Sequence, residues 1–137
     1  DELGCRLHVA TRNPDKAREF LDDMKVEKPG DSMTLSSQEA LNKACSASGI
    51  IIQATPVGSD GERHKIDWSN VRPDTVAFEM VYRPQETPFV ADARKAGCRV
   101  VEGWEMLLAQ GAAALKLWTG RQPPLDAMRA ALLENIS

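Results

Sequence analysis

Short apolar runs alternate with amphipathic stretches along most of this chain. Strands are predicted at 6–10, 33–35, 49–55, 75–82 and 98–103. The runs at 49–55 and 75–82 are nearly continuous, which predicts strands buried on both faces. Apolar residues at helical spacing predict helices at 14–24, 37–45, 87–96, 103–118 and 125–135. Strands that alternate with helices predict an α/β fold built on a parallel sheet.

Local signals set the expected ends of these helices. Asn13 is a good N-cap before Pro14, which suits a first helical position, and Ser36 with Glu39 forms a capping-box pattern. Gly97 and Gly120 are typical of residues that follow a helix. The first helix is expected to bury one face, made of Ala17, Phe20, Leu21 and Met24.

Length and composition indicate an ordinary globular domain. The chain has 137 residues, of which 42% are hydrophobic and 27% charged. A net charge of −3 argues against a general nucleic-acid surface. No apolar run approaches a membrane span, and the acidic start is not a signal peptide, so neither nucleic acid nor membrane is expected as a partner.

The cysteines and histidines indicate no metal or disulfide chemistry. Cys5, Cys45 and Cys98 are odd in number and far apart, as expected for thiols in a reducing compartment. His8 and His64 belong to no metal-binding pattern. We therefore expect a cytoplasmic protein without a metal site.

Polar loops follow several of the predicted strands. In parallel α/β sheets, ligands bind outside the carboxyl ends of the strands. The segments that come to this edge are TRNPDK at 11–16, TPVGS at 55–59, VYRPQET at 81–87 and EGWEM at 102–106. Their convergence favours a nucleotide site, although every α/β protein has loops at this edge.

The first of these loops carries two cations, Arg12 and Lys16, beside a helix start. In a dinucleotide fold, an arginine after the second strand accommodates the 2′-phosphate of NADP, whereas a carboxylate there selects NAD. A guanidinium forks onto phosphate oxygens and an ammonium adds a point charge. The alternative interpretation is that both are solvated surface charges.

Three ordered blocks together resemble the cofactor half of the shikimate 5-dehydrogenase family. They are QATPVG at 53–58, EMVYRPQETP at 79–88 and GWEMLLAQ at 103–110. The Tyr-x-Pro-x-x-Thr-Pro and Gly-x-x-Met-Leu-x-x-Gln spacings are the specific ones. The sequence departs from the family pattern at Thr11 (for Asn), Asn13 (for Thr), Gln53 (for Asn), Glu79 (for Asp) and Ser59 (for Met).

The resemblance implies NADP as cofactor and a shikimate- or quinate-type substrate. It implies that Thr55 and its neighbours line the nicotinamide ribose through their backbone and that Met80 and Gly103 border the nicotinamide. It implies that Tyr82 and Gln110 reach the substrate; the alternatives are a strand-end core tyrosine and a surface amide. It also implies a 2′-phosphate site made of Thr11, Arg12, Asn13 and Lys16.

The family's glycine-rich pyrophosphate loop has no counterpart before Arg6, and its catalytic lysine and aspartate have none in this chain. We therefore expect a truncated, Rossmann-like, doubly wound parallel sheet at 1–120. The helix within 121–137, with Leu125, Met128, Leu132 and Leu133, would pack on an absent substrate domain. No catalytic residue is assigned, and the chain alone is expected to be inactive.

Two further expectations follow from this interpretation. Apolar surface left open by truncation favours self-association. The alternative to an NADP-dependent enzyme half is a non-catalytic binding or regulatory module derived from the same fold.

Overall fold

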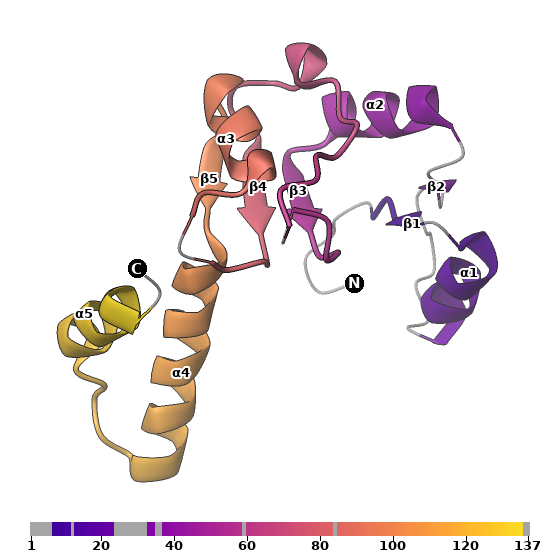
Figure 1. The fold of residues 1–137 in the computed structure, drawn as a ribbon. Coiled ribbons are helices and arrows are strands. Elements are labelled where there is room, and N and C mark those ends of the chain that lie inside the picture. The colour runs from indigo at the N-terminus through magenta and orange to yellow at the C-terminus, as the bar shows by residue number, and fades with distance from the viewer. Residues whose placement is uncertain are drawn as a thin grey trace. The chain divides into compact units, whose positions relative to one another are not determined.

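The computed structural model describes residues 7–11, 13–23, 33–34, 37–58, 60–83 and 85–135. The chain divides into two compact units. The first comprises Asp1–Ala47 with Lys65–Asn70, and the second comprises Ser48–His64 with Val71–Ser137. Figure 1 draws both along one chain.

The first unit holds a two-stranded parallel sheet and two helices. Strand β1 (Ala10–Thr11) pairs with β2 (Met33–Thr34), Ala10 lying opposite Met33. Helix α1 (Pro14–Asp23) buries Ala17 and Leu21, and helix α2 (Gln38–Ala47) packs against the 3-10 helix η1 (Trp68–Asn70). Phe20, predicted on the buried face of α1, is instead 52% exposed.

The predicted caps account for where these helices begin. Asn13 Oδ1 accepts hydrogen bonds from the backbone N–H of Asp15 (3.1 Å) and Lys16 (3.2 Å), which fixes the start of α1. The α2 cap is Ser37, whose Oγ accepts from Ala40 N at 3.3 Å. The predicted capping residue Ser36, and also Arg6 and Met24, lie outside the described residues.

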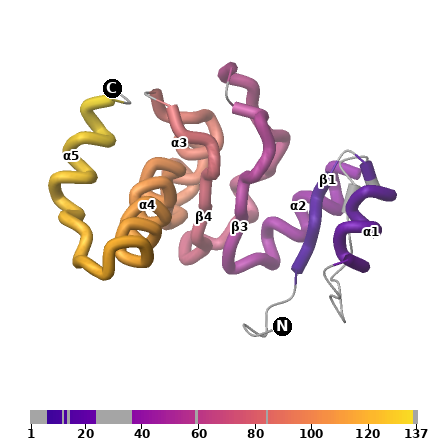
Figure 2. The backbone as a smooth tube through the Cα atoms, turned by 90° about the horizontal axis from the view of Figure 1, so that it is seen from below, coloured from indigo at the N-terminus to yellow at the C-terminus, as the bar shows by residue number. Residues whose placement is uncertain are grey.

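The second unit is built on a three-stranded parallel sheet in the order β3-β4-β5. The strands are β3 (Ile50–Gln53), β4 (Val76–Glu79) and β5 (Arg99–Val101). Helix α3 (Pro88–Lys95) packs on β4 and β5 and buries Phe89, Val90 and Ala93. Figure 2 shows β3 and β4 side by side, with α3 next to β4.

Two further helices complete this unit. Helix α4 (Gly103–Thr119) and helix α5 (Leu125–Asn135) pack against each other (Figures 1 and 2). Helix α4 ends where Gly120 adopts φ 67°, a left-handed conformation that glycine adopts without strain. Gly97, with φ 83°, follows α3 in the same way. Both helix ends confirm the sequence prediction.

The strand predictions need two corrections. The strand predicted at 6–10 is reduced to β1, because pairing with β2 extends over only two residues. Strand β3 is buried on one face and not on two: Ile50 and Ile52 are 58% and 57% exposed, whereas Ile51 and Gln53 are buried. Successive side chains of a strand point to opposite faces, so one face of β3 is covered and the other is open.

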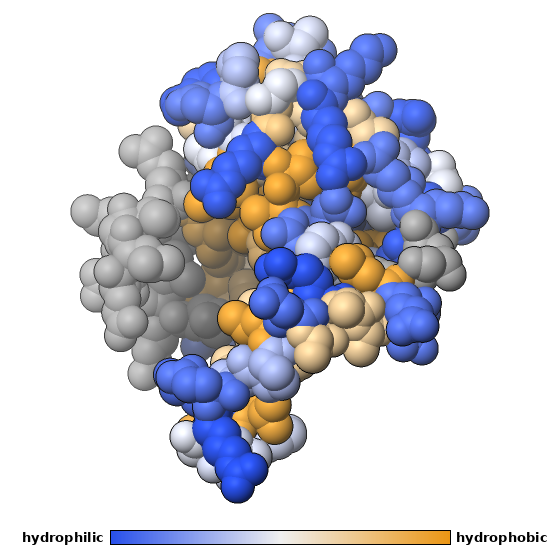
Figure 3. All heavy atoms as spheres, turned by 90° about the vertical axis from the view of Figure 1, so that its left-hand side faces the viewer, coloured by the Kyte–Doolittle hydropathy of each residue, from blue (hydrophilic) through white to orange (hydrophobic). Residues whose placement is uncertain are grey.

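Large apolar side chains also reach the surface near the end of the chain. Leu117 and Trp118, in the last turn of α4, are 82% and 80% exposed. Leu125 and Leu133 on α5 are partly exposed as well. Figure 3 shows apolar side chains at the surface between charged ones.

The described cysteines, Cys45 and Cys98, are free and buried, in agreement with the sequence prediction. Burial raises the pKa of Cys45 to about 11 and raises that of Cys98. Cys5 lies outside the described residues. Across the described segments, no helix combines the length and the apolar character that a membrane crossing requires.

Candidate cofactor and substrate site

Three segments of the second unit meet at the carboxyl edge of its sheet. They are the β3 loop (residues 54–58), the β4 loop (residues 80–83 and 85–87) and the start of α4. Because β3, β4 and β5 run parallel, their carboxyl ends lie at one edge, where such sheets bind ligands. All five residues predicted for the nicotinamide and the substrate lie in or near these segments.

The β3 loop is held by the side chain of Gln53, the last residue of β3. Gln53 Nε2 donates to the carbonyl oxygens of Thr55 (2.8 Å) and Val57 (2.7 Å), and its Oε1 accepts from Thr55 N at 2.6 Å. Thr55 Oγ1 in turn accepts from Val57 N at 3.2 Å. The longer amide that replaces the family's asparagine therefore closes a compact, internally bonded turn.

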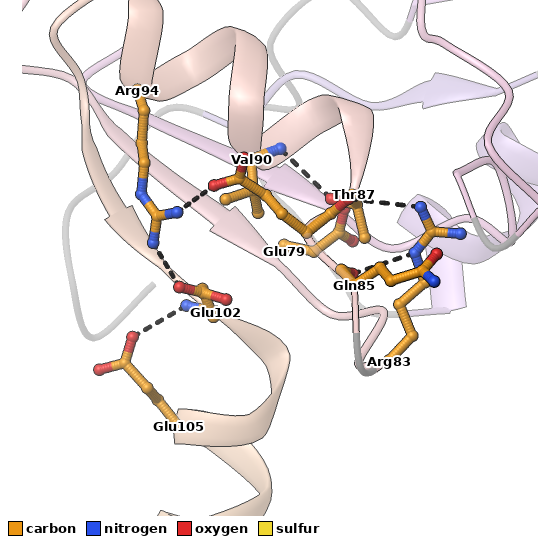
Figure 4. Close-up of polar contacts among 9 residues, drawn as sticks. Glu79, Arg83, Gln85, Thr87, Val90, Arg94, Glu102 and Glu105 are labelled. Atoms are coloured by element: carbon orange, nitrogen blue, oxygen red, sulfur yellow. Dashed lines mark hydrogen bonds and ion pairs between the residues drawn. The ribbon is translucent and has the colours of Figure 1, made fainter. Parts of the chain in front are cut away.

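The β4 loop is held in a similar way by Glu79, the last residue of β4 (Figure 4). Glu79 Oε1 accepts from Val81 N and Oε2 accepts from Thr87 Oγ1, both at 2.9 Å. Thr87 Oγ1 also accepts from Val90 N at 3.2 Å and so caps α3. Burial raises the pKa of Glu79, and the hydrogen bonds from Val81 and Thr87 oppose that rise.

Gly103, the first residue of α4, lies directly against the β4 loop. A β-carbon on Gly103 would lie 2.7 Å from the Val81 carbonyl oxygen and 2.9 Å from that of Met80. Both neighbours are backbone atoms, which cannot rotate away as a side chain can. A glycine is therefore required for α4 to approach the loop this closely.

Ion pairs join the same segments at the surface (Figure 4). Arg94, on α3, pairs with Glu86 of the β4 loop and with Glu102, which precedes α4. Glu105 Oε1 accepts from Glu102 N at 3.0 Å. These side chains are partly exposed, so each pair contributes on the order of 0–1 kcal/mol to stability.

The predicted nicotinamide and substrate residues differ in their accessibility. Gly103 is buried, Thr55 is half-buried and Met80 is partly exposed. Tyr82 is 52% exposed and lies beyond the end of β4, so the alternative of a strand-end core tyrosine is wrong. Gln110 is exposed on α4, as both of its interpretations expect.

The predicted 2′-phosphate residues belong to the first unit. Thr11 Oγ1 accepts from Asn13 N at 3.3 Å, and Asn13 uses its side-chain oxygen to cap α1. The Asn13 amide group and the exposed Lys16 ammonium remain available for an anion. Arg12 lies outside the described residues, as does Ser59. The 2′-phosphate site therefore stays a prediction.

The segments of the second unit fit the nicotinamide end of a dinucleotide. Exposed Met80 offers apolar surface beside the backbone contact at Gly103, as a flat ring requires. Thr55 accepts from Val57 with its hydroxyl oxygen and keeps its own proton to donate to a ribose oxygen. Among the described residues, no group of three or more His, Cys, Asp or Glu is placed to hold a metal ion.

Sequence reasoning treated Gln53 and Glu79 only as departures from a pattern and did not single out Arg94. A signal for the first two was present, because each is a polar residue that interrupts an apolar run. Such a residue becomes buried while the loop after it still needs hydrogen bonds. No comparable signal marked Arg94, whose partners lie eight residues away on either side.

Comparison with known proteins supports the resemblance. The shikimate 5′-dehydrogenase C-terminal domain model matches residues 103–133. The NADP(+) shikimate dehydrogenase of Microcystis aeruginosa is 33% identical over 140 residues, covering 98% of this chain and 49% of that protein. The chain spans about half the length of the relatives it matches.

Solved structures show the same relation. Shikimate 5-dehydrogenase from Listeria monocytogenes, solved with shikimate and NAD, superposes with a TM-score of 0.81 and 27% identity. That match covers 93% of this chain and 47% of the other. Ligand-free 5-ketofructose reductase of Gluconobacter sp. strain CHM43 superposes with a TM-score of 0.80 and 28% identity. That match covers 97% of this chain and 48% of the other.

Parallel strands joined by helices, with loops organised at their carboxyl edge, define a Rossmann-like α/β domain. Within this class, the chain belongs to the shikimate 5-dehydrogenase family and corresponds to its C-terminal half. Both the predicted fold class and the predicted family are confirmed.

Proposed function

We propose that this chain is the NADP-binding half of a shikimate dehydrogenase, which reversibly reduces 3-dehydroshikimate to shikimate. One observation carries the proposal. The three segments that resemble the family's cofactor half lie at the carboxyl edge of one parallel sheet, with Gly103 packed against the Met80–Val81 backbone. The relatives named NADP(+) shikimate dehydrogenase support the choice of cofactor and substrate.

The resemblance supplies a candidate residue for each part of the cofactor. In the proposal, Thr11, Arg12, Asn13 and Lys16 bind the 2′-phosphate, as two cations and two polar groups are suited to do. Thr55 contacts the nicotinamide ribose, and Met80 and Gly103 border the nicotinamide. When bound, NADP supplies the hydride acceptor, and the protein supplies binding and orientation.

The substrate would be bound by Tyr82 and Gln110. A phenol and an amide can form hydrogen bonds with hydroxyl or carboxylate groups. The exposure of both side chains leaves them accessible to a ligand. Their role is to orient a polyol for reaction and does not include proton transfer.

Replacing Gln110 with Ala in the full gene product should weaken substrate binding only. Losing one hydrogen bond to a substrate hydroxyl costs about 1–3 kcal/mol, so the KM for shikimate should rise roughly 5- to 100-fold. Steady-state kinetics with each ligand varied in turn measures this. Gln122→Ala, at an exposed amide just after α4, is the matched control and should leave both KM values unchanged. Loss of NADP affinity instead would place Gln110 on the cofactor side.

The 137-residue chain alone should not oxidise shikimate. The reaction needs a general acid–base at the substrate hydroxyl, which the family resemblance places in the substrate domain. At the carboxyl edge of this chain, Glu79 is 1% exposed and fully engaged, and Glu86 and Glu102 are paired with Arg94. Nicotinamide absorbance of the purified chain with shikimate and NADP measures turnover, and saturable turnover would contradict this prediction.

We also propose that residues 1–120 form the NADP-binding part and that the helix within 121–137 packs on a substrate domain. Helix α5 covers α4 with only part of its apolar surface: Met128 lies over Gly111, while Leu125 and Leu133 stay partly exposed. Exposed Leu117 and Trp118 extend this apolar area. A cytoplasmic location stays a prediction.

Self-association of the isolated chain is expected through the open face of β3. Exposed isoleucines on β3, the outer strand of the sheet among the described residues, favour association with a second copy. Sedimentation at micromolar concentrations should therefore give a mass above that of a monomer, and Ile52→Lys should lower it. Lys116→Ala on α4 serves as control. A concentration-independent monomer would contradict the prediction.

A spectrophotometric assay of the full gene product tests the proposed function. We expect turnover with shikimate and NADP, and less with NAD. Quinate and the reduced product of 5-ketofructose belong in the same panel, because quinate is a substrate type that the resemblance implies and one similar structure is a 5-ketofructose reductase. Turnover with either of these but not with shikimate would replace the proposed substrate.

A further inference from the structure

The last residues of two neighbouring strands form a buried polar pair. Gln53 and Glu79 lie opposite each other in the β3–β4 register, and they are 4% and 1% exposed. Neither side chain is used within the sheet. Each bonds to the loop that follows its own strand.

The Gln53 amide is fully used by the β3 loop. Both of its N–H donations go to loop carbonyls, of Thr55 and Val57, and its oxygen accepts from Thr55 N–H. Polar backbone groups of the loop are thereby turned toward the sheet. The Thr55 hydroxyl is fixed as the acceptor of the Val57 N–H.

The Glu79 carboxylate joins the two ends of the β4 loop. One oxygen accepts from Val81 N–H at its beginning. The other accepts from the Thr87 hydroxyl at its end, where both residues are labelled in Figure 4. Tyr82 lies between these two anchors. The end of β3 is also linked to the start of the β4 loop, because Gln53 O accepts from Met80 N at 2.9 Å.

Stability alone does not account for this pair. A buried carboxylate is costly, and apolar residues of similar shape at paired positions are often neutral or stabilising. A polar side chain that bonds two separated points of a loop instead fixes the conformation of that loop. That is the property a ligand site needs from the residues behind it.

We propose that Gln53 and Glu79 are positioning residues with separate tasks: Gln53 orders the β3 loop for the cofactor, and Glu79 orders the β4 loop for the substrate. The inference rests on the proposed function, since it assigns Thr55 to the cofactor and Tyr82 to the substrate. Neither positioning residue contacts a ligand. Their effects are transmitted through loop backbone.

The test compares Gln53→Leu and Glu79→Leu with wild type in the full gene product. We expect Gln53→Leu to raise the KM for NADP roughly ten-fold or more, as the loss of buried hydrogen bonds implies. The KM for shikimate should stay within about two-fold of the wild-type value. Glu79→Leu should show the reverse pattern, because Met80, the residue of this loop assigned to the nicotinamide, is held by its own hydrogen bond to Gln53 O. Glu79→Gln, which keeps an acceptor for Val81 N–H, should restore near-wild-type values.

Amide hydrogen exchange supplies a readout independent of activity. Exchange at Thr55 N–H should accelerate in Gln53→Leu, and exchange at Val81 N–H should accelerate in Glu79→Leu, because each amide loses its acceptor. Where Glu79→Leu fails to fold, Thr87→Val removes one anchor of the same loop and Thr87→Ser retains it. The shikimate KM should then rise for valine and not for serine.

The outcomes separate this inference from the proposed function. A wild type without turnover of shikimate overturns both. Turnover with KM values that rise together in each variant, or with unchanged exchange at Thr55 and Val81, overturns the inference and leaves the function standing. The inference is supported if each variant raises the KM for only its own ligand and accelerates amide exchange at the residue that lost its acceptor.

Discussion

Replacing Gly103 with alanine is expected to destabilise the protein and to impair binding of both ligands. The new β-carbon would lie 2.7–2.9 Å from backbone oxygen atoms of Met80 and Val81. Overpacking of this kind costs about 1–3 kcal/mol, and more where the neighbour is backbone. Either α4 or the β4 loop must move, and both take part in the proposed site.

Thermal unfolding and steady-state kinetics of Gly103→Ala measure the two effects together. The melting temperature should fall by several degrees, and the KM values for NADP and shikimate should both rise. Gly111→Ala on the same helix is the matched control, because its β-carbon would lie 3.6 Å from Met128 Cε, an ordinary contact. There alanine should stabilise the helix by about 0.5–1 kcal/mol. Unchanged stability and kinetics in Gly103→Ala would contradict the close approach of α4 to the backbone of Met80 and Val81.

Replacing Arg12 with alanine in the full gene product is expected to weaken NADP binding without affecting NAD. A charge-assisted, forked contact to a phosphate contributes roughly 1.5–3 kcal/mol, which corresponds to about ten-fold or more in affinity. NAD has no 2′-phosphate, so its binding does not depend on a phosphate contact with Arg12. Calorimetric titration with each dinucleotide measures the difference.

Arg18→Ala is the appropriate control for Arg12. Arg18 is an exposed cation on α1 that pairs with Asp15 at 2.7 Å, and no role in the site is assigned to it. Its removal lowers the local positive charge by the same amount, yet NADP affinity should change less than two-fold, as is usual for exposed charges. Equal losses with NADP and NAD in Arg12→Ala would mean that Arg12 supports the structure and does not select the cofactor.

The helices were predictable because local chemistry determines their ends. Asn13 and Pro14 start α1, Thr87 and Pro88 start α3, and Gly120 ends α4. The bounds of α5 match the prediction at both ends. These signals act within a few residues, so the sequence alone contains them.

Burial on the sheet was less predictable, because it depends on what packs against each face. The apolar run at 49–55 is compatible with a strand covered on one face or on both. Ile50 and Ile52 are exposed while Ile51 is buried, a difference that no local pattern specifies. Phe20 on α1 is a similar case.

The sequence predicted which residues would make up the candidate site, but it did not predict the side chains that hold its loops. Motif spacing brought Thr55, Met80, Tyr82 and Gly103 to one edge of one sheet, and the structure agrees. The hydrogen bonds of Gln53 and Glu79 behind the loops required coordinates, because the choice of partner depends on loop conformation. The Arg94 pairs are equally dependent on the fold.

A crystal structure of the full gene product with NADP and shikimate tests the central claim most directly. We expect the nicotinamide ring beside Met80 and Gly103, the 2′-phosphate on Arg12 and Lys16, and shikimate within hydrogen-bond distance of Tyr82 and Gln110. Ligands bound away from the β3 loop, the β4 loop and the start of α4 would contradict the proposed site.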